Sequence, residues 1–412
     1  MTLRAAFACL LILSLLAACA VPAASTPAPA GPTEPPPPTA TAEPTVRPTR
    51  TPWPSPTPRP CIAEGDQTYI NARLRAANDV AVLCPGAVIE LTGPVVFTAD
   101  GQQVYTEGFP TDDTRAVLRI VSPDLANAVY MRDFNNAVLS HVVVDGNRPA
   151  LGYKGGDALI YAGGSSTGQI IRHVRIIEPR SWSALQLIQG HPAPEPPCTN
   201  ALVENNEIGP AGQSDGSWSD GISLGCTNTI VRNNLIVDAT DGGIVIFGAP
   251  GSIIEGNTIR AETRILLGGI NMVDYIEPYN GDYTGTIVRN NTIDAAGAVI
   301  RIGLAMGFRV WGCWPPDDNR VLTGGQVIGN VLRGANMQYG FAVSGVKDWT
   351  VLDNRDESTH VGRATRDCYG KIPVNPAGFQ FDPKRSQGTF QPEFTEGYLD
   401  LALMAVRSQP FP

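Results

Sequence analysis

Aspartates gather in one stretch of the chain where a pair of carboxyls could cleave a glycosidic bond. Asp220 and Asp241 each precede a glycine and a short apolar run, and Asp215 lies in the loop before Asp220. Glycoside hydrolysis uses two carboxyls about 5–9 Å apart, one of which protonates the leaving oxygen. Like charges this close raise the pKa of one partner and keep its proton available. We expect Asp220 to be the acid and Asp241 the base, with Asp215 in reserve.

Other side chains nearby have the chemistry of sugar recognition. Tryptophan offers a flat apolar face to a sugar ring. The residues that we assign to substrate binding are Trp182, Trp218, Asp157, Gln186, Asn271 and Arg301. Asp157 also suits a simpler role at a corner, because aspartate bonds its own backbone in turns. Trp218 would desolvate Asp220 and favour its protonated form.

Two repeated motifs would bring these residues together. In the first, an asparagine lies between two short apolar runs, at Asn206, Asn234, Asn257, Asn291, Asn330 and Asn354. Spacings of 23 to 39 residues indicate a solenoid in which each repeat adds one coil. Asparagine tolerates a left-handed backbone and can bond the same amide one coil away. We expect the six asparagines to stack as a ladder at one bend.

The second motif is a strand that opens with small residues. It occurs as DALIY (157–161), SALQL (183–187), DGISL (220–224), GGIVI (242–246), GGINM (268–272), AVIRI (298–302) and YGFAV (339–343). Apolar residues alternate with variable ones, as in a half-buried strand. The alternation predicts an outward row of Ile160, Gln186, Ser223, Val245, Asn271, Arg301 and Ala342. Since stacked strands are about 4.8 Å apart, Asp220 and Asp241 should share one edge of this face.

The predicted fold is all-β, a right-handed single-stranded parallel β-helix (solenoid) with two strands per coil from about residue 80 to 360. An amphipathic cap helix should precede it over 66–79, with Ile70, Leu74 and Ala77 on one face. Residues 82–91 read as the first coil. The segment 388–412 lacks the repeat and should wrap the last coil.

The first 60 residues predict export. Residues 1–18 combine a basic start with an apolar run, as in a signal peptide, and residues 16–19 (LAAC) resemble the lipobox of bacterial lipoproteins. Cys19 would then carry the lipid. Residues 19–60 are mainly Pro, Thr and Ala and should form a disordered tether reaching about 100 Å. This leaves 61–412 as one folded β-helix domain of an extracellular, cell-surface protein.

An even number of cysteines in an exported domain indicates disulfides, here among Cys61, Cys84, Cys198, Cys226, Cys313 and Cys368. Cys198 and Cys226 open the same Cys-Thr-Asn segment in neighbouring coils, so they should stack within bonding reach. Cys61–Cys84 would pin the cap helix, and Cys313–Cys368 follows by elimination. No CxxC or HxxxH spacing is present, so we predict no metal site.

The net charge of −9 argues against nucleic acid or an anionic membrane surface as a partner. We expect the partner to be a polysaccharide substrate. The protein should be a monomer that reaches the membrane only through its N-terminal lipid.

On these motifs the folded domain resembles the right-handed parallel β-helix, pectin-lyase-like superfamily, and in part polygalacturonase-type glycosidases. In that family an Asp-Gly strand start is followed one coil later by further acid, and then by an Arg-Ile-Lys strand. This chain has Asp220-Gly221, Asp241 and Arg301-Ile302. The resemblance implies a general acid and a water-activating base, with Arg301 holding a substrate oxygen. Gly303 stands where the family has lysine, which favours a neutral glycan over a polyuronate.

Two other functions remain open. A polysaccharide lyase on this fold would need a base, for which Arg301, Lys154 and His173 are candidates, and Ca²⁺ would then be a cofactor held by the aspartates. A hydrolase would need no cofactor. His173 shares a repeat slot with His141, which favours a structural role. In a non-catalytic glycan-binding or envelope protein, the aspartates would be corner residues.

Overall fold

The computed structural model describes residues 60–394 except 190–195, 214–216, 316 and 367–372. The chain divides into two units, 1–57 and 58–412, and every described residue belongs to the second. The predicted signal peptide, Cys19 and nearly all of the tether therefore lie outside the described residues. Among those described, no helix is long and apolar enough to cross a membrane.

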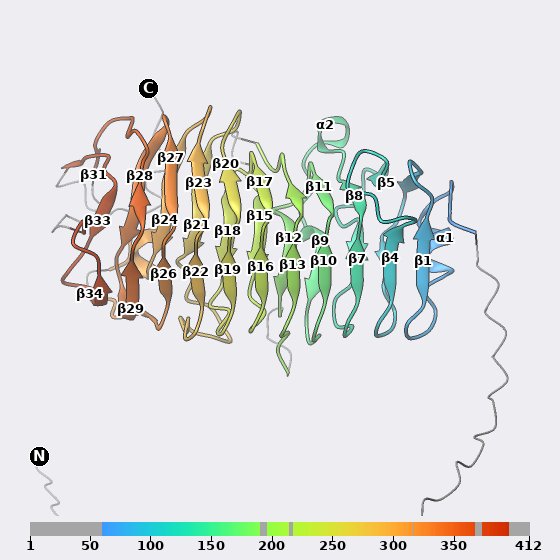
Figure 1. The fold of residues 1–412 in the computed structure, drawn as a ribbon, viewed down its shortest axis with the longest axis horizontal. Coiled ribbons are helices and arrows are strands. Elements are labelled where there is room, and N and C mark those ends of the chain that lie inside the picture. The colour runs from blue at the N-terminus through green and yellow to red at the C-terminus, as the bar shows by residue number, and fades with distance from the viewer. Residues whose placement is uncertain (1–59, 190–195, 214–216, 316, 367–372, 395–412) are drawn as a thin grey trace, which may run out of the picture. The chain divides into compact units, whose positions relative to one another are not determined.

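Three long parallel sheets stack strand upon strand along the molecule (Figure 1). The first sheet contains β1 (Val80–Leu83), β4 (Gln103–Thr106), β7 (Val138–Ser140), β10 (Ile170–Arg172), β13 (Leu202–Glu204), β16 (Ile230–Arg232), β19 (Ile253–Glu255), β22 (Ile287–Arg289), β26 (Gln326–Ile328), β29 (Val346–Leu352), β25 (Leu322–Thr323) and β34 (Ser386–Phe390). The second contains β2 (Val88–Leu91), β5 (Ala116–Ile120), β8 (Val142–Asp145), β11 (Arg175–Ile177), β14 (Glu207–Ile208), β17 (Leu235–Val237), β20 (Thr258–Arg260), β23 (Thr292–Ala295), β27 (Val331–Gly334) and β30 (Arg355–Asp356).

The third sheet contains β3 (Val95–Val96), β6 (Val129–Tyr130), β9 (Ala158–Gly163), β12 (Ser183–Ile188), β15 (Asp220–Leu224), β18 (Gly242–Ile246), β21 (Leu266–Met272), β24 (Ile300–Met306), β28 (Met337–Val343) and β33 (Phe379–Phe381). Outside these sheets lie the antiparallel pair β31 (Thr365–Arg366) and β32 (Pro373–Val374), and the short helices α1 (Gln67–Asn71), α2 (Arg148–Leu151) and α3 (Phe308–Trp311).

The predicted parallel β-helix is confirmed, but each coil has three strands rather than two. The coil β16, β17 and β18 shows why. The apolar runs on either side of Asn234 are separate strands of the first and second sheets, and the small-residue motif supplies the third. The coils also continue past residue 360, because β33 extends the third sheet. Isoleucine, leucine and valine side chains stack between the sheets as one core.

The asparagine ladder is confirmed at the bend between the first and second sheets. The Nδ2 group of each asparagine donates to Oδ1 of the next at 2.8 to 2.9 Å, through Asn206, Asn234, Asn257, Asn291, Asn330 and Asn354. Gln391, which the repeat does not predict, continues the ladder by accepting from Asn354 at 3.3 Å. Asn257 is typical: its Nδ2 also donates to the Val231 carbonyl, and its Oδ1 accepts the backbone N–H of Asn234. The amide is therefore fully bonded while buried.

The left-handed backbone at this bend belongs to the residue before each ladder asparagine. Asn205, Asn233 and Asn290 have φ of 54° to 55°, and Gly256 has φ of 63°. The two properties of asparagine that suggested the ladder are thus divided between neighbouring positions. The first residue turns the chain, and the second bonds the coils.

A row of glycines explains why the strands of the third sheet open with small residues. A Cβ on Gly221 would lie 2.5 Å from the carbonyl oxygen of Gly243, and a Cβ on Gly243 would lie 2.5 Å from that of Gly269. A Cβ on Gly269 would lie 2.4 Å from the carbonyl oxygen of Gly303. Consecutive coils approach here more closely than any side chain allows. The glycines therefore fix the register of the third sheet.

The start of the domain differs from the prediction. The helix expected over 66–79 ends at the close of α1, and only part of its apolar face is buried. Ile70 and Leu74 are buried, whereas Ala77 is exposed. The carboxylate of Asp79 accepts two backbone N–H groups of the preceding turn, at 2.7 and 2.8 Å, in place of helical bonds.

Two predicted disulfides are present. Cys61 bonds Cys84, and Cys198 bonds Cys226 with a Cα–Cα distance of 4.8 Å, close to one strand spacing. Cys313 is also disulfide-bonded. Its expected partner, Cys368, lies outside the described residues.

Replacing Asn257 by alanine should destabilise the domain, because it leaves buried amide and carbonyl groups of the coils on both sides unbonded. We expect a loss of about 1–3 kcal/mol in the free energy of unfolding, measured by urea denaturation. Asn233→Gly is the matched control, since Asn233 is exposed and glycine adopts its φ of 54° readily. Equal stability of the two variants would contradict a structural role for the ladder.

Candidate active site

The two aspartates predicted to act together lie on the third sheet, one residue out of step. Ile222 of β15 pairs with Ile244 of β18, so Asp220 lies level with Gly242 rather than with Asp241. The N–H of Gly242 accordingly donates to Asp220 Oδ1 at 3.0 Å. The 21-residue spacing therefore does not place the two carboxyls in one slot. The negative charge of Asp241 nevertheless raises the pKa of Asp220.

Asp220 is buried, with 4% of its surface exposed, and contacts a chain of hydroxyls. Ser223 Oγ lies 2.8 Å from Asp220 Oδ2 and 2.9 Å from Ser183 Oγ, and Ser183 Oγ donates to the Leu185 carbonyl at 3.0 Å. When Asp220 is protonated, each hydroxyl in this chain can donate to the next oxygen, and the last proton goes to the carbonyl. The surroundings of Asp220 therefore accommodate a neutral acid.

The electrostatics of the site favour protonated carboxyls. Burial raises the pKa of Asp220 well above its usual range, and the charge of Asp241 raises that pKa further. Hydrogen bonds from Ser223 and Gly242 oppose this rise in part. Burial and the charge of Asp241 likewise raise the pKa of Asp274 to about 7. Burial and like charge thus shift both carboxyls toward their protonated forms.

Asp274 is the member of this cluster that the sequence motifs do not single out. It lies just after β21, at the opposite end of the strand from the positions where the motifs place acids. Its backbone N–H donates to Tyr283 Oη at 3.3 Å, and the Tyr283 hydroxyl donates to the Ile246 carbonyl at 2.6 Å. The available signal in the sequence is an acid two residues after the GGINM strand, at the start of the insertion before β22.

Part of the predicted outward row is present beside these acids. Gln186, Ser223, Val245 and Asn271 follow one another across β12, β15, β18 and β21. Gln186 and Asn271 are buried, and neither Gln186 Oε1 nor the two amide atoms of Asn271 makes a hydrogen bond. A Cβ on Gly242 would lie 3.0 Å from Asn271 Nδ2 and 3.3 Å from Asp220 Oδ1, so both side chains lie over this glycine.

The predicted row is wrong at two other strands. Tyr161 rather than Ile160, and Ala305 rather than Arg301, occupies the row. The sequence motif aligned Ala298 with the small residues of the other coils. The residue of β24 that fits the close-approach row is instead Gly303, which shifts the register of this strand.

An apolar cluster covers the outer face of the sheet beyond the aspartates. It consists of Leu267, Val273, Ile302, Ala305, Val310, Tyr339, Ala342 and Val374. Trp218 is partly buried and packs against this cluster. Arg301 is 5% exposed, and its Nη1 donates to Gln338 Oε1 at 3.0 Å. Trp218 and Arg301 thus belong to a covered surface rather than to an open one.

The remaining predicted residues lie at different distances along the coils. The Trp182 carbonyl accepts the backbone N–H of Asp220 at 2.8 Å, which places Trp182 beside the acid. Asp157 is exposed and lies two coils away from Asp220, because Ala158 pairs with Ser183 of the intervening coil. Asp215 lies outside the described residues.

The aspartates interact through charge rather than through a shared metal-binding geometry. Within the part of the chain that the structure describes, no three His, Cys, Asp or Glu side chains are grouped so as to hold a metal ion. What the arrangement offers chemically is proton transfer, from carboxyls with raised pKa values to a group on the outer face of the third sheet.

Comparison with known proteins identifies the repeat. A family model described as "Right handed beta helix region" matches residues 127–355. No curated protein sequence matches the chain significantly. Similar solved structures include the surface adhesin PfbA of Streptococcus pneumoniae (12% identity, 76% of this chain and 90% of that chain, TM-score 0.44). Others are an exopolygalacturonase from Thermotoga maritima (12%, 66% and 84%, 0.40) and an alginate lyase from Paenibacillus sp. str. FPU-7 (15%, 73% and 98%, 0.33).

The pKa of Asp274 predicts a pH dependence of stability. Because its pKa is about 7 in the folded state, the folded protein binds more protons than the unfolded chain between about pH 4 and 7. The contribution of Asp274 to stability is therefore present below this window and is lost as the pH rises through it. In urea denaturation, the free energy of unfolding of Asp274→Asn minus that of the parent should increase as the pH is raised from 4 to 8. Parallel stability curves for the two proteins would contradict a raised pKa.

Proposed function

The chain belongs to the right-handed beta-helix family, and on this scaffold we propose that it is a glycoside hydrolase that cleaves a polysaccharide. The supporting observation is the cluster of Asp220, Asp241 and Asp274 on the third sheet, in which burial and mutual charge raise two pKa values. Glycosidic hydrolysis requires carboxyls of unlike protonation state side by side. The raised pKa of Asp220 supports its assignment as the protonated partner.

In the proposed reaction Asp220 is the general acid and Asp241 the general base. Asp220 gives its proton to the glycosidic oxygen as the bond from that oxygen to the anomeric carbon breaks. Asp241 takes a proton from the water that attacks the same carbon. Ser223 and the Gly242 N–H hold the Asp220 carboxyl in position. Asp274, with a pKa of about 7, remains neutral in mild acid and so adds no further repulsion there.

The buried amides of the same row would bind the sugar. Gln186 Oε1 and both amide atoms of Asn271 have unused hydrogen-bonding capacity, and Asn271 lies over Gly242 with Asp220. Sugar hydroxyls both donate and accept, which matches an amide. Trp182 would border this position with apolar surface, whereas Trp218 supports it from within the covered apolar cluster. Arg301 would act through Gln338, to which it is bonded, rather than directly on a substrate oxygen.

The structure gives less support to a polysaccharide lyase. Lys154 forms an ion pair with Asp124 at 3.7 Å, and His173 stacks on His141 at 4.7 Å between the first and second sheets. Arg301 belongs to the third sheet but is buried. A lyase product, which is unsaturated, and glycan binding without any product are the two outcomes that would replace the hydrolase proposal.

We further propose that the domain is exported and held at the cell surface as a lipoprotein. The Cys61–Cys84 and Cys198–Cys226 disulfides support an oxidising compartment outside the cytoplasm. Lipid on Cys19 and the Pro- and Thr-rich segment 20–60 would tether a monomeric domain within reach of extracellular polysaccharide.

Asp220→Asn and Asp241→Asn should each lower the rate of reducing-end release from a polysaccharide that the parent cleaves. General acid or base catalysis predicts losses of about 10²-fold or more, since the amide keeps the shape but cannot transfer the proton. Asp294→Asn is the matched control, because Asp294 pairs with Arg260 on the second sheet. Full activity of both site variants would show that these carboxyls are structural.

Cys19→Ala should release the protein from the membrane into the medium. Without the cysteine, no lipid can be attached, and none of the helices that the structure describes is long and apolar enough to hold the domain in a membrane. Fractionation of cells and medium measures the outcome. Membrane association of the variant at the level of the parent would exclude lipid attachment at Cys19.

A further inference from the structure

A row of aliphatic side chains that runs through the core ends in a carboxylate at the last coil. The second sheet places one such side chain per coil at paired positions on consecutive strands from β11 to β27. These buried residues are Ile176, Ile208, Ile236, Ile259, Ile293 and Leu332. The next position in the row, on β30, is Asp356, which pairs with Leu332. A carboxylate therefore takes the place of a core side chain.

Asp356 points inward, as the aliphatic residues before it do. A Cβ on Gly303 would lie 2.9 Å from Leu332 Cδ2, and one coil further a Cβ on Gly340 would lie 2.9 Å from Asp356 Oδ2. A Cβ on Gly378 would lie 2.3 Å from the same oxygen, which places the carboxylate by β28 and the start of β33. Only 6% of the Asp356 side chain is exposed. It is therefore not a polar cap that faces water, and a carboxylate buried in this way needs a partner.

His360 is this partner. Its Nε2 lies 2.8 Å from Asp356 Oδ2, and its Nδ1 lies 3.0 Å from the carbonyl oxygen of Gln338. A carbonyl oxygen only accepts, so Nδ1 carries a hydrogen, and a second hydrogen must lie between Nε2 and the carboxylate. The pair therefore holds one proton more than a neutral imidazole beside an ionised carboxylate. Loss of that proton would set a nitrogen lone pair against a buried negative charge.

The pair lies where the last coil joins β28 in the third sheet (Figure 1). On one side of the carboxylate, His360 forms a bridge with Met337, whose carbonyl accepts the N–H of Val361 at 2.8 Å. On the other side, the carbonyl of Gly378 accepts the N–H of Phe341 at 2.7 Å, where β33 begins to pair with β28. Repulsion between the two side chains would therefore loosen both contacts of the last coil.

The nearby charged groups have other partners. Arg301 of β24 donates to Gln338 Oε1 at 3.0 Å, so Gln338 lies between this cation and His360. Glu357, the residue after Asp356, forms ion pairs with two exposed arginines, Arg333 and Arg355. The carboxylate of Asp356 is therefore the charge that acts most directly on the imidazole.

The two pKa values shift in opposite directions. Burial lowers the pKa of His360, but the bonds to Asp356 and to the Gln338 carbonyl, with the charge of Asp356, outweigh burial and raise it. Burial raises the pKa of Asp356, but bonds from His360 and Ser358 outweigh burial and lower it. The pair therefore stabilises the fold fully between about pH 4 and 6.5, the usual values of the two groups. This stability is lost as the pH rises through the folded-state pKa of His360.

We propose that Asp356 and His360 form a proton-dependent latch that holds the last coil on β28 in mild acid and releases it above neutral pH. Buried bonds in the earlier coils come from asparagine amides, such as Asn234 to Asn257, which do not titrate. An asparagine in place of Asp356 could likewise donate to a neutral His360. The carboxylate therefore makes this contact sensitive to pH. The latch does not depend on Asp220 or Asp241 being catalytic.

Hydrogen exchange of the purified protein, followed by mass spectrometry and corrected for intrinsic rates, tests the latch. Between pH values of about 6 and 8.5, on either side of the usual start of histidine deprotonation, amide exchange in β28 and β33 of the parent should rise about 10-fold or more, because a hydrogen bond between charged groups is lost. Asp356→Asn should remove most of this rise, since neutral His360 then accepts from the new Nδ2 and still donates to Gln338. No rise in the parent, or an equal rise in both proteins, would overturn the latch.

Glu357→Gln is the matched control, because it removes the adjacent exposed acid and should keep the pH dependence of the parent. A second measurement follows the ring protons of the four histidines by NMR, with His360→Gln identifying the His360 signal. In the parent this signal should titrate above the usual histidine pKa, and in Asp356→Asn it should titrate at lower pH. A His360 signal that titrates below the usual value in the parent would contradict the proposal.

Discussion

The row of buried asparagine amides fixes the bend between the first and second sheets once in every coil from Asn206 onward. Each amide donates to the amide and carbonyl of adjacent coils and accepts from the coil before it. A coil that shifted or turned would leave several of these groups buried without partners, which costs more than the net gain of forming the bonds. The ladder therefore sets how one coil stacks on the next. The third sheet inherits this stacking, because each of its strands is the continuation of a coil already fixed at the bend.

The glycine row adds a second constraint on the same stack, and together they decide which side chains meet. Gly221, Gly243 and Gly269 bring successive coils so close that the outward residues beside them must share a narrow strip. Asp220 is buried in this strip with Asp241 nearby. Both the removal from water and the like charge act in one direction on the Asp220 carboxyl, toward its neutral form. The raised pKa of Asp220 thus follows from its burial between stacked coils and from the charge of Asp241.

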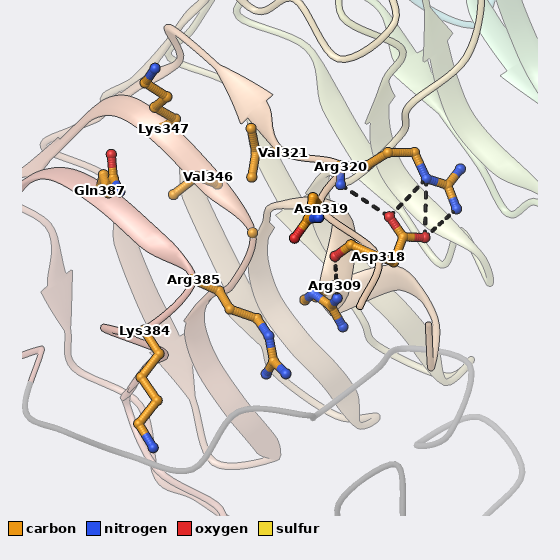
Figure 2. Close-up of a pocket in the computed structure, with 11 residues that line it drawn as sticks. Arg309, Asp318, Asn319, Arg320, Val321, Val346, Lys347, Lys384, Arg385 and Gln387 are labelled. Carbon is orange, nitrogen blue, oxygen red and sulfur yellow. Dashed lines mark hydrogen bonds and ion pairs between the residues drawn. The ribbon is translucent and has the colours of Figure 1, made fainter. Parts of the chain in front are cut away.

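Insertions between the strands supply side chains that the repeated coils do not contain. The segment 307–321 covers part of the third sheet with Val310, and its Arg309 lines a pocket near the C-terminal coils together with residues 318–321 (Figure 2). The segment after β21 adds Asp274 to the acid cluster and Tyr275 to the wall behind it. A regular coil has no place for such features, since its residues point either into the core or directly outward.

The sequence by itself determined the parallel β-helix, the asparagine ladder and the Cys198–Cys226 pairing. Each repeats at one slot per coil, so a local pattern specifies a contact between residues far apart. Only the tertiary structure decided that a coil has three strands, that Gly303 sets the register of β24 and displaces Arg301, and that Asp274 joins Asp220. The covering of the outer face was decided there as well. These features depend on how long insertions pack over the coils, and insertions have no period from which a contact could be read.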